Sequence, residues 1–120
     1  MFEETLRHIV DRTDGAVGAL IMGLDGISVA RADADDNTVD IDVVAAEYTA
    51  LLRKSMRTAE DAALGQMREL VVTSDSLAFL ITPITEEYFL LLVLQPHGGL
   101  GRARFELKKA QLALEEEFSI

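Results

Sequence analysis

The sequence predicts a single α+β domain, in which helices cover both faces of one five-stranded, mostly antiparallel sheet. Apolar residues recur at helical spacing in three segments and at strand spacing in five. Short turns join the strands, except where the longest helix intervenes. The order is α-β-β-α-β-β-β-α, and the domain spans residues 1–120. Because the sheet needs cover on both faces, we expect the long helix on one side and the two terminal helices on the other.

The longest predicted helix covers Asp40–Leu64, a stretch that contains neither glycine nor proline. Its apolar residues form a face that is wider than the stripe a helix needs to cover a core. Asp40 suits the N-cap position, where a carboxylate can accept hydrogen bonds from free backbone N–H groups. Gly65 is expected at the C′ position that follows the helix.

The segments before the long helix are predicted as a short helix and a hairpin. The short helix ends at Thr13–Gly15. The hairpin joins two strands, Ala16–Met22 and Ile27–Arg31, across a turn that contains an Asp-Gly step. In the second strand, Ile27 and Val29 alternate with polar residues, which is typical of a strand that pairs back on its predecessor.

Three strands and a helix are expected after the long helix. The strands are Met67–Ser74, Leu77–Pro83 and Tyr88–Gln95. The last of these is apolar on both faces, as a central strand covered on both sides would be. A Pro-His-Gly-Gly turn then leads into Leu100–Phe118, which has one apolar face at helical spacing.

The composition indicates an acidic protein without cysteine chemistry. The 120 residues include 21 acidic and 11 basic side chains, for a net charge of −10, and no cysteine. Such a charge repels phosphate backbones, so nucleic-acid binding is not expected. Disulfides and thiolate metal sites are excluded. We find no signal peptide and no apolar run long enough to span a bilayer, so we expect a cytoplasmic protein without membrane insertion.

The sequence predicts no catalytic residues, no metal site and no cofactor, so an enzyme is not expected. His8 and His97 lie far apart and are expected at the surface. The glycines that open the last helix could favour an anion there, but no Lys-Ser/Thr pair follows them, so they do not form a P-loop. The acidic segment 33–42 lacks the glycine and the terminal glutamate of an EF-hand loop.

The wide apolar face of the long helix predicts a homodimer, because one five-stranded sheet should not cover all of it. The strand Met67–Ser74 is a candidate sheet edge, and an open edge can pair with a second copy. The expected dimer contacts are Tyr48, Leu51, Ser55, Leu70 and Val72. Alanines on the outer arc of the helix either reflect helix propensity or provide a strip on which a partner docks closely.

Several segments resemble the Roadblock/LC7 family, and the similarity extends along the chain. They are Met1–Gly15 (MFEETLRHIVDRTDG), Leu20–Gly26 (LIMGLDG), Glu86–Leu90 (EEYFL) and Gly99–Leu107 (GLGRARFEL). The set looks most like the bacterial MglB-type members. The resemblance implies a Roadblock/LC7 fold and a homodimer with a continuous ten-stranded sheet, on which two long helices form a platform.

The resemblance also implies that this platform binds a small Ras-like GTPase of the MglA type. Such a regulator activates the GTPase by repositioning its switch residues, without an arginine finger, in cell polarity or motility. The docking residues expected here are Val43, Ala46, Ala50, Arg53 and Arg57. The alternative is a non-catalytic Roadblock-type adaptor. From the residues alone, Arg53, Arg57, Arg102 and Arg104 either act on phosphoryl transfer in a partner or lie on solvated faces.

Overall fold

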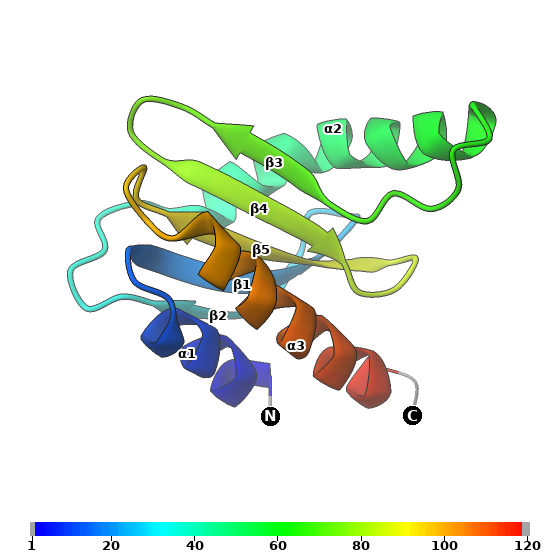
Figure 1. Ribbon diagram of the computed structural model, residues 1–120. Coiled ribbons are helices and arrows are strands. Elements are labelled where there is room, and N and C mark those ends of the chain that lie inside the picture. The colour runs from blue at the N-terminus through cyan, green and yellow to red at the C-terminus, as the bar shows by residue number, and fades with distance from the viewer. Residues whose placement is uncertain (1, 119–120) are drawn as a thin grey trace.

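A computed structural model describes residues 2–118 and confirms the predicted order of elements (Figure 1). The helices of this part are α1 (Phe2–Arg12), α2 (Ile41–Asp61) and α3 (Leu100–Phe118). The strands are β1 (Ala16–Gly23), β2 (Ser28–Asp33), β3 (Leu70–Thr73), β4 (Ala78–Pro83) and β5 (Tyr88–Leu94). They form one antiparallel sheet in the order β2-β1-β5-β4-β3.

The sheet lies between two helical layers, as the sequence predicts. α1 and α3 pack on one face, and α2 lies along the other (Figure 1). The core on the first face includes Leu6 from α1 and Leu107 from α3. The core on the second face includes Ile41 and Leu52 from α2. Full burial of one such side chain contributes about 1.5–3 kcal/mol, so each layer is held mainly by its apolar contacts with the sheet.

Strand β5 is the centre of the core and is buried on both faces. Leu90 and Leu92 pack under α1 and α3, whereas Leu91 and Val93 pack under α2. β1 and β4 pair with β5 on either side. Its sequence is therefore continuously apolar, because both alternating sets of side chains are removed from water.

The start of α2 confirms the predicted N-cap and is tied to β2. The Asp40 side chain accepts a hydrogen bond from the Val43 N–H at 3.4 Å. Arg31 of β2 donates to Asp42 in the first turn of α2 at 2.8 Å and to Asp33 at 2.6 Å. The Arg31 hydrogen bond holds the pKa of the Asp33 carboxyl below its usual range.

The end of α2 shows that the assignment of Gly65 to the C′ position is wrong. Ala63 is the C′ residue, with a left-handed φ of 56°. The Ala63 N–H donates to the Glu60 carbonyl at 3.0 Å, and the Leu64 N–H donates to the Ala59 carbonyl at 2.8 Å. These are the two hydrogen bonds of a Schellman motif, so the helix is closed before the chain reaches Gly65.

Strand β2 begins and ends later than predicted, and a β-bulge changes which of its side chains reach the core. The strand covers Ser28–Asp33, and its register with β1 shifts at Val29. Ala30 and Ala32 are buried on the α1 side. Ile27 and Val29 remain 66% and 39% exposed. A bulge bends the strand and redirects its side chains, which the alternating pattern alone does not reveal.

Candidate partner-binding surface

The outer face of α2 presents the predicted docking residues to solvent. All five are exposed: Val43, Ala46, Ala50, Arg53 and Arg57. Val43 has 56% of its surface exposed. Ala46 and Ala50 have short side chains, so another protein can approach the helix backbone closely at these positions. The opposite side of α2 is already occupied by its packing on the sheet.

Arg53 belongs to this surface but also has a partner within the chain. Its Nη1 donates a hydrogen bond to the Leu24 carbonyl in the turn between β1 and β2. The guanidinium is therefore held at the turn, and Arg53 fixes the position of that turn against α2. The sequence did not indicate this bond, because the two residues lie 29 positions apart.

The predicted dimer residues on α2 lie along the flank that faces β4 and β3. The Tyr48 ring packs on Phe79 of β4, with centroids 5.5 Å apart and planes tilted by 49°. Ser55 is half-buried on the same flank. Leu51 remains 43% exposed. This flank is therefore an apolar surface that a single copy covers only in part.

β3 lies at one edge of the sheet, as predicted, although it is shorter than the expected strand. In the part of the chain that the structure describes, it pairs only with β4. Leu70 and Val72 are half-buried and pack beside the core under α2. An apolar edge strand next to a partly exposed helix flank favours pairing with another strand.

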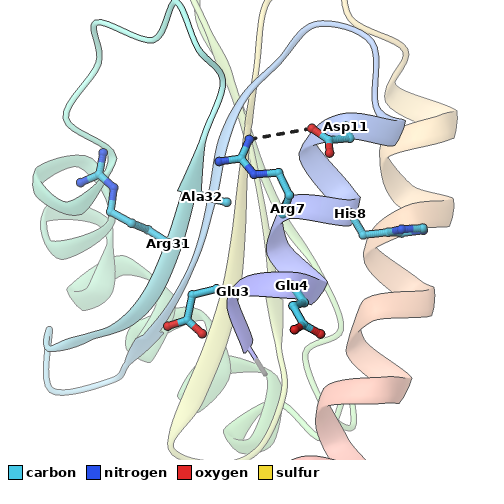
Figure 2. A pocket seen from close by; sticks show the side chains of 7 residues that line it. All are labelled: Glu3, Glu4, Arg7, His8, Asp11, Arg31 and Ala32. Carbon is cyan, nitrogen blue, oxygen red and sulfur yellow. Dashed lines mark ion pairs between the residues drawn. The ribbon is translucent and has the colours of Figure 1, made fainter.

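β2 forms the other edge, and polar side chains border it. A groove of about 460 Å³ lies between α1 and β2, and Arg7 and Asp11 at its lining form an ion pair of 3.8 Å (Figure 2). Arg7 also donates to the Asp33 carbonyl of β2 at 2.9 Å. The Arg31 side chain is directed away from α1 (Figure 2), toward its bonds with Asp33 and Asp42. This edge is thus partly occupied by side-chain bonds.

Residues 2–118 show no cluster of metal ligands. None of their His, Cys, Asp and Glu side chains gather in groups of three or more that could hold a metal ion. His8 lines the groove beside β2, and His97 is exposed in the turn before α3. Among the described helices, none has the length and apolar character needed to cross a membrane.

Comparisons with known proteins agree with this architecture. The chain superposes on a Roadblock/LC7 domain from Streptomyces avermitilis with a TM-score of 0.86 and 15% identity, covering 98% of both chains. It is 29% identical to MglC from Myxococcus xanthus, with a TM-score of 0.72, covering 97% of this chain and 98% of that one. For the gliding protein MglB from Thermus thermophilus the TM-score is 0.85 and the identity 21%, over 96% of this chain and 86% of that one.

The sequence itself matches a family model. No curated protein matches the chain. Residues 1–95 match the model of the Roadblock/LC7 domain. That match covers most of the sequence, and the chain belongs to the Roadblock/LC7 family.

Proposed function

We propose that two copies of this chain form a cytoplasmic platform that binds a small Ras-like GTPase of the MglA type and activates it, in cell polarity or motility. Roadblock/LC7 domains are generally non-catalytic regulators or adaptors and typically dimerise. The observation that supports the proposal is the exposed outer surface of α2, where Val43 is 56% exposed and the small side chains of Ala46 and Ala50 lie open to solvent.

In the proposed dimer, the β3 strands pair and the two α2 helices lie side by side. On this flank of α2 the Tyr48 ring packs on Phe79 of β4, which pairs with Val72 of the open β3 edge. A single two-fold axis can therefore bury both features at once, as a self-complementary interface requires. The outer faces of both helices would then point in the same direction and form one continuous surface.

Activation would depend on differential affinity. A regulator accelerates hydrolysis only when it stabilises the switch arrangement of the transition state more than that of the ground state. An arginine finger must reach the transferred phosphate, whereas the Arg53 guanidinium is bonded to the Leu24 carbonyl. The small side chains at Ala46 and Ala50 are suited to close contact with switch loops.

The test introduces bulk at the centre of the proposed docking site. Ala46→Arg and Ala50→Arg should abolish detectable binding of the GTP-loaded GTPase, and sedimentation should still report a dimer. Both positions are exposed, so the sheet-facing side of α2 is unchanged. Ala113→Arg makes the same change at an exposed position of α3, across the sheet, and should bind normally. Normal binding by both α2 variants would reject this placement.

A non-catalytic adaptor is the second candidate. The identity to MglC is 29%, against 21% to the MglB of Thermus thermophilus, so the comparisons do not favour the MglB type. Release of phosphate by the GTPase, measured with and without this protein, separates the two functions. An adaptor would bind the GTPase and leave its rate of hydrolysis unchanged, whereas an activator would raise that rate.

A further inference from the structure

We propose that the outer face of α3 is a second docking surface, which binds an acidic amphipathic helix of another protein. This face lies across the sheet from α2 (Figure 1), so it is separate from the proposed GTPase site. Its centre is formed by Phe105 and Leu112, which are 54% and 53% exposed. They lie seven positions apart in α3, which places them on the same side of the helix, about 10 Å apart along its axis.

Two cations flank the exposed ring of Phe105. The Arg102 guanidinium lies 5.5 Å from the ring centroid, and the Lys109 ammonium lies 5.3 Å from it. Both distances are within the range of cation–π attraction. The Arg102 side chain is 51% exposed and the Lys109 side chain 47%. A partner that covers Phe105 therefore meets both positive charges at the border of the contact.

One buried carboxylate holds the two cations in place. Glu106 has 1% of its side chain exposed, and its two carboxylate oxygens lie 2.9 Å from Arg102 Nη2 and 3.5 Å from Lys109 Nζ. This pairing restricts both cations before a ligand arrives, so they lose less conformational freedom on binding. Lys108 is exposed on the same helix. Three positive side chains and one negative one leave this group with a net charge of +2.

The order of charges along α3 is the reverse of the order that stabilises a helix. Acidic side chains are favoured in the first turn of a helix and basic ones in the last turn. α1 follows this rule, with Glu3 and Glu4 in its first turn and Arg12 in its last. α3 has no acidic residue in its first turn and no basic residue in its last, where the run Glu115–Glu117 lies instead. Helix stability therefore does not explain the position of the cations, whereas a binding role does.

The charge of the strip identifies the kind of partner. The chain as a whole carries a net charge of −10, so a positive group beside two exposed apolar side chains is complementary to an acidic, apolar ligand. A flat anionic membrane would also face Glu4 and Asp11, which are exposed on α1 in the same layer, and Glu115–Glu117. A helix can contact the strip alone. Two apolar residues two turns apart, with acidic residues between them, would match Phe105, Leu112 and the cations.

The experiment measures the binding of two synthetic helical peptides to the full-length protein by fluorescence anisotropy. One peptide has two leucines seven positions apart with glutamates between them on the same face, and the other has lysine in place of each glutamate. The acidic peptide should bind, and the basic peptide should bind about tenfold more weakly or not at all. Phe105→Ser should raise the Kd for the acidic peptide about tenfold or more. Lys108→Glu should act in the same direction, and it leaves both ion pairs of Glu106 intact.

Matched controls make the same changes outside the strip. Leu64→Ser replaces an apolar side chain that is 75% exposed after α2, and Lys54→Glu reverses a charge that is exposed on α2. Both should bind the acidic peptide like the parent. Ala50→Arg should also bind it like the parent, because Ala50 lies across the sheet from α3. The inference and the proposed GTPase site can therefore fail independently.

Four outcomes would overturn the inference. The first is equal binding of the acidic and basic peptides, or binding of neither. The second is parent-like binding of the acidic peptide by both Phe105→Ser and Lys108→Glu. The third is co-sedimentation of the parent with phosphatidylserine vesicles that is lost in Phe105→Ser, which would assign the strip to a membrane surface. The fourth is a smaller mass in sedimentation for Phe105→Ser than for the parent, which would assign the strip to a second copy of the chain.

Discussion

Replacement of Ala63 by glycine should stabilise the protein, because Ala63 has a left-handed backbone at the C′ position of α2. A residue with a Cβ atom loses about 1–2 kcal/mol in this conformation. Glycine avoids that strain but gives the unfolded chain more conformational freedom, which costs about 0.4–1 kcal/mol. Ala63 is exposed, so its methyl group contributes little buried apolar area. The expected net increase in the free energy of unfolding is about 0.5–1 kcal/mol.

Urea denaturation followed by circular dichroism measures this difference. All variants are compared at one protein concentration, because dimerisation would make apparent stability depend on concentration. Ala62→Gly is the matched control, since Ala62 is the C-cap with φ −88° and ψ 7° and has no left-handed strain to relieve. It should lower the stability. A similar loss of stability in Ala63→Gly would refute the assignment of Ala63 to the C′ position.

Three further changes test separate parts of the structure. Asp33→Asn should weaken the dependence of stability on acid pH. Arg31 lowers the pKa of Asp33 in the folded protein. The ionised Asp33 carboxylate therefore stabilises the fold above its unfolded pKa of about 3.9, and this stabilisation is lost as the pH falls through the lower folded pKa. An acid unfolding transition that is unchanged in Asp33→Asn would contradict this. Arg53→Ala and Arg57→Ala should retain most stimulated phosphate release at saturating regulator, whereas loss of an arginine finger lowers the rate by about 10³-fold or more. Val72→Lys should give monomers in sedimentation, because a charge on an edge strand opposes pairing, and an unchanged dimer mass would exclude β3 as the interface.

The sequence predicts the layers and strand order well, because apolar spacing reports directly which side chains must leave water. β5 is the clearest case, since its unbroken apolar run requires cover on both faces and so places it inside the sheet. Two features were misplaced, one because of strand pairing and one because of a local helix cap. The exposure of Val29 follows from the pairing register with β1. The helix end at Ala63 shows that the preference for glycine at C′ is a tendency, and here the chain closes two residues before Gly65.

The spacing of apolar residues also predicts part of the candidate partner-binding surface on α2. Helical spacing separates the buried face of α2 from its outer face, so the exposure of Ala46 and Ala50 follows from the sequence. The bond from Arg53 to the Leu24 carbonyl does not, because it depends on how the β1–β2 turn meets α2 in three dimensions.

The two edge strands of the sheet, β2 and β3, differ chemically. This difference would limit assembly through β3 to two copies. At the β2 edge, the Arg7 side chain bonds to the Asp33 carbonyl, and a bulge at Val29 interrupts the regular pairing surface. At the β3 edge, Leu70 and Val72 supply apolar side chains next to the partly exposed flank of α2. Two equally open edges would let copies add without limit, because each new copy would present another free strand. One open edge would instead give a closed pair, with the two α2 helices at its centre.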